Sequence, residues 1–406
     1  MKKTVKKKTW TKKRHRIIKR IVAPFFDLVP KKFYHCDIIH FPSDGRNYLV
    51  LSNHQTVVDQ YIVSAIFKEP VYFVAMEDLF SKGFFSRFLE WTTAPVPILK
   101  GTTDVSTVRN CIKIAKEGGT IVLFPEGNRT YNGKTCYIGP QVAKLIKLLR
   151  IPVAFVRIEG GYGVRPRWSD HIRNGSMKAG VTKVIEPELY QEMENDALYD
   201  LICDELYVDD NNDGKQYSCT GLAEGLERVL YYCPKCSLTE FKTENNKIIC
   251  SSCGSTYTLN PDQTLDCPDD GTSFKNVSDW YDSQEQFIKK SDPESWSEHP
   301  AFVDVAKIYE VIINKHKKII ERCGNIKLFG DRIEIIGKNE KRIWYYKDIK
   351  AMTCVGCHKL NIYLKNDLYQ FSGNKHYNAL KYCNFYYHYK YLQSTHLDGE
   401  FEFLGL

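Results

Sequence analysis

The first half of the chain alternates short apolar runs with longer segments in which apolar residues recur every three or four positions. The short runs have the length and composition of buried strands, whereas the longer segments have the periodicity of helices. This alternation is typical of an α/β fold with a mostly parallel sheet. The expected strands are residues 48–51, 71–76, 95–99, 120–124 and 152–158, and the expected helices are residues 57–67, 105–117 and 141–149.

The second half has a different pattern. Residues 260–300 are rich in Pro, Asp, Ser and Gly, as linkers are, and a helix-like run is expected near residues 303–322. Short alternating segments then predict a C-terminal antiparallel-β domain, which a helix at residues 378–392 closes. This order resembles a PH-like or GRAM-like domain in pattern only, which implies a docking or lipid-facing role. The expected strands are residues 326–328, 332–336, 342–346, 349–354, 360–364 and 368–371.

An imidazole and a carboxylate follow the first expected strand. His54 and Asp59 are five residues apart, and such residues lie about 140° apart around a regular helix, so they would not face each other inside one. The pair can interact only if His54 stands in the loop before the helix and Asp59 lies in its first turn. Thr56 is a candidate N-cap for that helix. The alternative for His54 is a buried histidine that a neighbour satisfies.

A second polar block follows the fourth expected strand. Residues 124–130 read FPEGNRT and offer a carboxylate, a flexible glycine and a guanidinium within four residues. Strand ends of this kind are where α/β enzymes keep their chemistry. A base and an anion clamp are what acyl transfer to a phosphorylated alcohol needs. The alternative for Glu126 and Arg129 is a local salt bridge at a turn, worth under about 1 kcal/mol.

Residues 48–160 are similar, block by block, to the glycerolipid acyltransferase family, the PlsC-like lysophosphatidate acyltransferases. Asn53-His54 through Asp59 matches the NHxxxxD motif of that family, and residues 124–130 match its FPEGTRS motif. The resemblance implies that His54 is the general base for the acceptor hydroxyl. It also implies that Asp59 holds the imidazole in the right tautomer and stabilises the imidazolium.

The resemblance further implies a group of substrate-binding residues. Arg129 would hold the phosphate of the acceptor bidentately, together with Lys100, which stands where the family usually has an Arg. Gly127 would let the backbone approach the ligand closely, and Glu126 would bond a glycerol hydroxyl or orient Arg129. A second departure is Phe155, where a second Pro is common. These departures bear on the identity of the acceptor and leave the reaction type in place.

Two CxxC motifs, thirteen residues apart, form the other strong pattern. Two such knuckles suit a tetrahedral structural Zn²⁺ site with four thiolate ligands and no open position for catalysis. Disulfides are the alternative, but the chain shows no secretory signal, so a reducing compartment is expected. A helix is expected before this zinc ribbon, at residues 221–232, and a strand after it, at residues 255–259. The expected ligands are Cys233, Cys236, Cys250 and Cys253.

The net charge of +8 is concentrated at the N-terminus. Residues 1–20 contain eleven Lys or Arg and no acid, while the other 386 residues carry 46 basic and 49 acidic side chains. A basic run beside apolar residues suits an anionic membrane surface, where each cation contributes about 1 kcal/mol. Nucleic acid and a merely solvated tail are the alternatives, and nucleic acid is the least favoured. The apolar residues beside the run are Ile17, Ile18, Ile21, Val22, Phe25 and Phe26.

No apolar stretch reaches the ~20 residues that cross a bilayer. The apolar residues 21–30 are interrupted by Pro24 and Asp27, which makes them too short for the core of a secretory signal. We therefore expect a cytoplasmic protein that lies peripherally on the inner face of the membrane.

These observations predict an enzyme of phospholipid biosynthesis with no catalytic cofactor. It would move a fatty acyl group from acyl-CoA or acyl-carrier protein to a lysophospholipid, with lysophosphatidate as the first choice. The alternatives are another polar-lipid or glycerol-phosphate acceptor, and a non-catalytic zinc-containing lipid-binding adaptor. The expected regions are a membrane-facing segment (1–47), the acyltransferase domain (48–215), a helix and the zinc ribbon (216–260), a linker and helix (261–318), and the β domain with its C-terminal helix (319–406).

Overall fold

The computed structural model describes residues 9–76, 79–80, 83–98, 105–268, 273–312, 316–338, 340–365 and 367–394. The chain forms two compact units. The first unit consists of Met1–Gly127, Ile138–Glu159 and Met177–Val208, and the second consists of Asn128–Tyr137, Gly160–Ser176 and Asp209–Leu406. The chain therefore passes between the two units several times.

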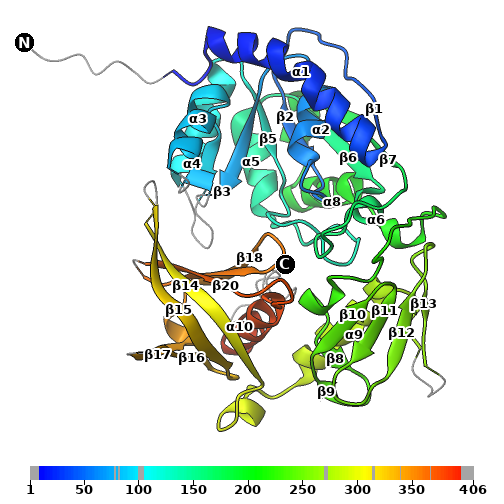
Figure 1. Ribbon diagram of the computed structural model, residues 1–406. Coiled ribbons are helices and arrows are strands. Elements are labelled where there is room, and N and C mark those ends of the chain that lie inside the picture. The colour runs from blue at the N-terminus through cyan, green and yellow to red at the C-terminus, as the bar shows by residue number, and fades with distance from the viewer. Residues whose placement is uncertain are drawn as a thin grey trace, which may run out of the picture. The chain divides into compact units, whose positions relative to one another are not determined.

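A seven-stranded sheet with the order β1-β7-β6-β2-β5-β3-β4 forms the centre of the first unit (Figure 1). β2 to β6 run parallel to one another, whereas β7 is antiparallel to β6 and parallel to β1. The mostly parallel α/β sheet expected from the apolar runs is confirmed. The strands are β1 (Cys36–Ile38), β2 (Leu49–Ser52), β3 (Val71–Met76), β4 (Val96–Ile98), β5 (Thr120–Leu123), β6 (Val153–Glu159) and β7 (Met177–Ile185).

Helices bury both faces of this sheet. Leu49, Leu51 and Ile121 share one core with α4, α5 and α8, and Val50, which points to the opposite face, is also fully buried. Strands buried on both faces read as continuous apolar runs, which explains why the sequence shows them so clearly. The helices are α1 (Lys13–Tyr34), α2 (Asp59–Ile66), α3 (Phe84–Thr92), α4 (Val105–Lys116), α5 (Gln141–Leu149), α7 (Pro187–Glu192) and α8 (Asn195–Leu206).

α1 is the longest helix of the first unit and contains both Pro24 and Pro30. It packs against α2, β1 and α3 and buries His15 and Lys19. Among the described residues, no helix has the length and apolar character that crossing a membrane requires.

The second unit contains a small antiparallel sheet with the order β10-β11-β12-β13, beside the two-stranded β8–β9 hairpin (Figure 1). Trp280 of α9 lies against the rings of Phe241, Tyr257 and Phe274, so this helix closes the core of the small sheet. The elements are α6 (Gly161–Val164), β8 (Tyr232–Cys233), β9 (Ser237–Leu238), β10 (Phe241–Glu244), β11 (Lys247–Cys250), β12 (Thr256–Leu259), β13 (Leu265–Asp266) and α9 (Val277–Lys290).

Two expectations for this region are wrong. The helix expected at residues 221–232 is replaced by turns and a 3₁₀ turn at Leu226–Arg228, because Gly221 and Gly225 have φ angles of +82° and +101° that interrupt a helix. The linker expected at residues 260–300 contains β13 and α9. Asn276 caps that helix by accepting a hydrogen bond from the backbone of Asp279.

The C-terminal part of the second unit is a seven-stranded antiparallel sheet with the order β17-β16-β15-β14-β20-β19-β18. The short strands after residue 325 and the closing helix are confirmed. The elements are β14 (Phe302–Ile312), β15 (His316–Leu328), β16 (Arg332–Ile336), β17 (Lys341–Tyr345), β18 (Ala351–Val355), β19 (Lys359–Tyr363), β20 (Leu368–Ser372) and α10 (Leu380–Gln393).

The helix expected near residues 303–322 is also wrong, because this segment is the β14–β15 hairpin. Val303 and Val305 are exposed while Ala306 and Ile308 are buried, as a strand requires. The register then shifts on both sides of Ile308, so that Val311 is the next buried residue. Such irregularities change which residues face the core, and they turned an alternating pattern into one of apparent helical period.

Candidate active site

Two neighbouring parallel strands bring the two polar blocks of the first unit together. β2 pairs with β5 in the register Leu51 with Leu123, so both strands end at the same edge of the sheet. His54 follows β2 and Glu126 follows β5. The Glu126 carboxylate accepts a hydrogen bond from the backbone N–H of His54, at 2.6 Å between nitrogen and Oε1.

Asp59 is the fully buried partner of His54. His54 Nδ1 lies 2.7 Å from Asp59 Oδ2, and that oxygen also accepts from the backbone N–H of Gln55 at 2.6 Å and of Thr56 at 2.9 Å. The Thr56 hydroxyl donates to Oδ1 at 2.5 Å. Four donors therefore fix the carboxylate.

The predicted local geometry of this pair is confirmed, since α2 begins at Asp59 and His54 stands in the loop before it. The expected capping role of Thr56 is wrong, because Val58 holds the N-cap position and no side chain caps α2. The Thr56 hydroxyl instead donates to the Asp59 carboxylate. Because that carboxylate can only accept, Nδ1 carries the proton and Nε2 is the basic nitrogen of the neutral ring.

Aromatic and amide groups hold the histidine in place. The His54 ring is 21% exposed and stacks on Phe124, with the centroids 4.3 Å apart. Asn53 bonds Ile158 of β6 in both directions, since its Nδ2 donates to the carbonyl at 2.8 Å and its Oδ1 accepts from the N–H at 2.7 Å. The sequence indicates Asn53 only as part of the NHxxxxD motif, and the apolar Phe124 carries no signal of its own.

Glu126 and Gly127 form a tight turn after β5. The Gly127 N–H donates to the Phe124 carbonyl at 3.0 Å, and Gly127 has a φ of +66°, in the left-handed region that glycine adopts without strain. Glu126 is 6% exposed. Its carboxylate is directed to the His54 backbone, a role that the sequence did not indicate.

The structure does not place the two expected phosphate-binding residues beside this pair. Lys100 is outside the residues that the structure describes. Arg129 is half-buried, and it lies in Asn128–Tyr137 of the second unit, where Arg167 donates from Nη1 to its carbonyl at 3.0 Å. The structure thus brings together His54, Asp59, Glu126 and Gly127 within the first unit.

The histidine and aspartate form an acid–base pair. Nε2 can accept a proton from a hydroxyl while Asp59 stabilises the imidazolium that results. Residues 33–159 match the family model Acyltransferase. The chain contains an acyltransferase domain.

The acyltransferase domain is similar to a curated relative and to a solved structure. The 1-acyl-sn-glycerol-3-phosphate acyltransferase BAT2, chloroplastic, of Brassica napus is 23% identical over 181 residues, which are 43% of this chain. The chain spans only 49% of that relative. The crystal structure of the 1-acyl-sn-glycerophosphate acyltransferase PlsC from Thermotoga maritima is 20% identical, with a TM-score of 0.38 over 46% of this chain and 78% of that chain. The matched residues include His54, Asp59, Glu126 and Arg129.

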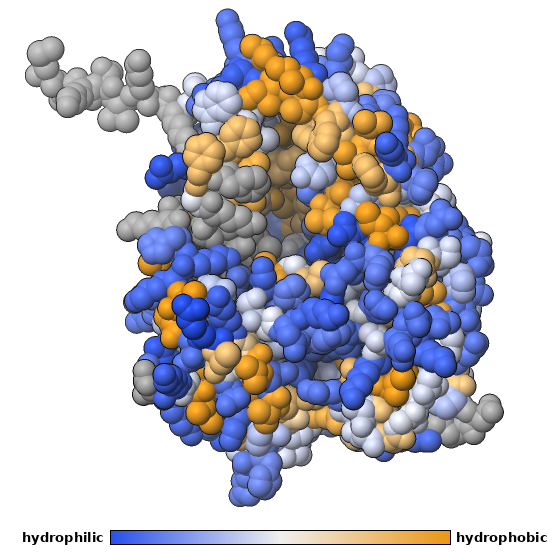
Figure 2. Space-filling model, in the orientation of Figure 1, coloured by the Kyte–Doolittle hydropathy of each residue, from blue (hydrophilic) through white to orange (hydrophobic). Residues whose placement is uncertain are grey.

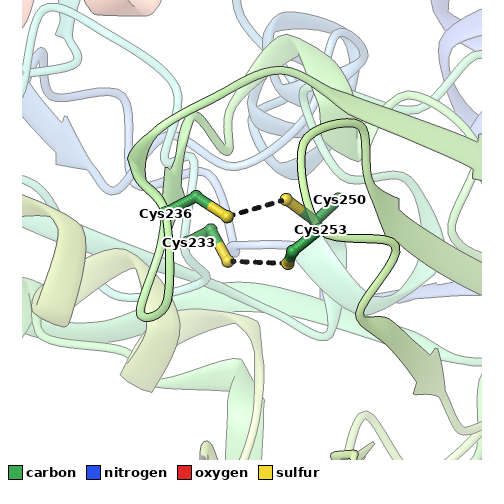
Figure 3. Close-up of side chains that lie close together, drawn as sticks. All are labelled: Cys233, Cys236, Cys250 and Cys253. Carbon is green, nitrogen blue, oxygen red and sulfur yellow. Dashed lines mark hydrogen bonds between the residues drawn. The ribbon is translucent and has the colours of Figure 1, made fainter.

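The four cysteines of the two CxxC motifs lie outside the acyltransferase domain, in the second unit. β8 and the turn after it carry Cys233 and Cys236, while Cys250 ends β11 and Cys253 follows in the next turn. All four side chains converge on one point (Figure 3). We call this group the cysteine cluster.

Proposed function

We propose that the chain transfers a fatty acyl group from a thioester donor, acyl-CoA or acyl-carrier protein, to the hydroxyl of a lysophospholipid. The observation that carries the proposal is the His54–Asp59 pair, which Glu126 holds in place inside an acyltransferase domain. The hydroxyl of the acceptor takes the place that a serine occupies in a hydrolase triad.

In the proposed reaction, Nε2 of His54 takes the proton of the acceptor hydroxyl as its oxygen attacks the thioester carbonyl. Asp59 stabilises the imidazolium. The carbon–sulfur bond then breaks, and the leaving thiolate takes the proton from His54. An ester and a free thiol result, and the histidine is neutral again for the next cycle.

Lysophosphatidate is the acceptor we propose. Support comes from the Brassica napus relative, which is named as a 1-acyl-sn-glycerol-3-phosphate acyltransferase, and from Arg129, which follows the Glu126–Gly127 turn in the chain. A guanidinium binds a phosphate through two parallel hydrogen bonds, and an ammonium binds it as a point charge, so Arg129 and Lys100 suit a phosphorylated acceptor.

We also propose that the first unit docks on an anionic membrane surface. α1 and α3 pack together, since Arg14 donates from Nε to the Trp91 carbonyl at 3.0 Å. Apolar side chains gather over α1 at the top of Figure 2. We call seven of the exposed apolar side chains of these helices the apolar ridge: Ile17, Ile21, Phe25 and Leu28 of α1 and Phe84, Phe88 and Trp91 of α3.

The charge of the chain supports this docking. Monomeric proteins rarely expose a large contiguous apolar patch unless it meets a partner or a membrane. Residues 1–20 supply eleven cations next to the apolar ridge in the sequence. Charge and inserted apolar surface together are the two signals that a stable peripheral anchor needs. A lysolipid substrate would reach the enzyme from the same surface.

The reaction can be tested with the purified full chain. Acyl-CoA and acyl-carrier protein would each be offered with lysophosphatidate, other lysophospholipids and glycerol 3-phosphate, and the products identified by mass spectrometry. We expect phosphatidate as the main product. If another acceptor is acylated instead, the proposed acceptor is wrong but the proposed reaction type stands. A folded protein that acylates none of these acceptors would refute the proposal.

A further inference from the structure

We infer that the cysteine cluster binds one zinc ion, which fastens the β8–β9 hairpin to the small sheet of the second unit. The inference rests on thiol geometry alone and is independent of the proposed acyl transfer. The first evidence for a metal site is the convergence of four thiols, two from β8 and the turn after it and two from the end of β11 and the next turn.

The separations of the sulfur atoms fit a tetrahedral ion. Zn–S bonds are about 2.3 Å long, which places two sulfurs of a tetrahedral site about 3.8 Å apart. The Sγ atoms of Cys233 and Cys253 are 3.8 Å apart, and those of Cys236 and Cys250 are 4.0 Å apart. All pairs among the four lie within 4.8 Å. The cysteine cluster therefore already has the dimensions of a zinc-bound site.

The same separations argue against two disulfides. A disulfide joins its sulfurs at about 2.05 Å, and forming one here would pull the two knuckles together. None of the four cysteines forms a disulfide in the structure. Four thiolates are also soft ligands, which select zinc or iron over the hard cations calcium and magnesium.

Neighbouring groups support the ligands. Gly254 has a φ of +75° and donates its N–H to the Cys250 carbonyl at 3.0 Å, which turns the second knuckle toward the ion. The hydroxyl of Ser255 lies 3.2 Å from Cys253 Sγ, and that of Thr239 lies 3.6 Å from Cys250 Sγ. Such outer contacts orient metal ligands and neutralise part of their charge.

The ion would have a structural role. Four thiolates complete the coordination of zinc and leave no position for substrate. β8 and β9 have only two residues each, and a hairpin this short is not stable by itself. Through Cys250 the ion would join it to β11, whose sheet packs on Trp280 of α9. Loss of the ion should therefore loosen the second unit.

Metal analysis of the purified full chain is the first test. We expect about one zinc per chain after dialysis against buffer with a reductant. Substitution with cobalt should give the intense visible absorption of a tetrahedral tetrathiolate complex. Iron in place of zinc, or a protein with no metal and all thiols free, would overturn the inference.

Two matched variants localise the ion. Cys253→Ser and Cys323→Ser each change an exposed cysteine of the second unit, but only Cys253 belongs to the cysteine cluster. We expect Cys253→Ser to bind zinc at least ~10-fold more weakly, as the loss of a ligand predicts, and Cys323→Ser to retain it fully. Equal zinc content and affinity in both variants would overturn the assignment of these ligands.

A chelator tests the structural role without any substitution. Removing zinc from the wild-type chain should lower the thermal midpoint of the second unit and speed hydrogen exchange in residues 232–259, because a ligand that binds only the folded state stabilises it. Readdition of zinc should restore both. Unchanged exchange in the metal-free protein would refute the fastening role.

Discussion

The backbone N–H of His54 donates a hydrogen bond to the Glu126 carboxylate at 2.6 Å, across 72 residues of sequence. Glu126 of the second motif thus positions the loop that carries His54, the proposed base. A charge-assisted hydrogen bond of this kind contributes about 1.5–3 kcal/mol. This hydrogen bond links the first motif to the part of the second motif that belongs to the first unit.

Glu126→Ala should lower kcat by roughly 10- to 10²-fold, the kinetic equivalent of losing that bond, with little change in KM for the lysolipid. Glu126→Gln keeps an acceptor oxygen and should fall between Ala and wild type. Steady-state kinetics with both substrates would check this, with Glu188→Gln, an exposed carboxyl of α7, as the control. A rise in KM for the lysolipid at constant kcat would instead place Glu126 in direct contact with substrate.

His54→Ala should lower turnover by ~10²-fold or more, the usual contribution of a general base, without unfolding the protein. Asp59→Asn should be equally severe, because the Asp59 carboxylate accepts four hydrogen bonds. His299→Ala is the matched control. His299 precedes Asp304 by the same spacing, but Asp304 bonds Lys381 and the His299 side chain is exposed. If a folded His54→Ala protein turned over substrate at the wild-type rate, the proposed mechanism would be wrong.

Residues of the apolar ridge should control binding to vesicles that contain anionic lipid. Ile21→Asp should weaken sedimentation with such vesicles by about 10-fold, because burial of one aliphatic side chain contributes ~1.5–3 kcal/mol. Leu189→Asp changes an exposed leucine of α7 outside the apolar ridge and should have no effect. If both variants sediment like wild type, the apolar ridge does not meet the membrane.

The basic run can be tested separately from the helix. Deleting residues 1–8 removes five lysines and should weaken vesicle binding by at least ~10-fold at low salt. A deletion through residue 20 would also remove His15 and Lys19, which α1 buries, so the shorter deletion is the cleaner change. The difference from wild type should shrink as salt is raised, because salt screens charge. A difference that persists at high salt would contradict an electrostatic role.

Asp210 should make the second unit less stable as the pH rises from about 4 to about 7. Burial raises the pKa of Asp210 to about 7, although the N–H groups of Gly160 and Tyr162 donate to its carboxylate and oppose the rise. The folded state keeps this proton to a higher pH than the unfolded chain, whose Asp pKa is near ~3.9. The unfolding free energy should therefore fall between about pH 4 and about pH 7, and lose nothing more from this group above that range.

Urea unfolding at a series of pH values would check this. Asp210→Asn should make the unfolding free energy fall less steeply between about pH 4 and about pH 7. Part of the fall should remain, because burial also raises the pKa of Glu285 to about 7. Glu244→Gln, at an exposed position of the same unit, is the control. If the unfolding free energy of Asp210→Asn falls with pH as steeply as that of wild type, the Asp210 carboxyl is not responsible for the fall.

The sequence predicted local features better than distant ones. The buried parallel strands were clear because each is a continuous apolar run, and the 140° argument correctly placed Asp59 at the start of α2. The β14–β15 hairpin does not show the alternation of a strand in its sequence, because register shifts around Ile308 disturb it. The bond from His54 to Glu126 could not be predicted, because it depends on β2 and β5 being neighbours, which only the order of strands in the folded sheet decides.

The Asn53 side chain substitutes for a peptide unit. It presents one donor and one acceptor to the backbone of Ile158, as the next residue of β2 would have done, and so the main chain can leave the sheet while the edge of β6 stays paired. Aspartate has the same shape but offers only acceptors, so it would face the Ile158 carbonyl oxygen with like charge. Glutamine has the right groups on a longer stem. Of these three amino acids, asparagine is therefore the one whose side chain fits the end of β2.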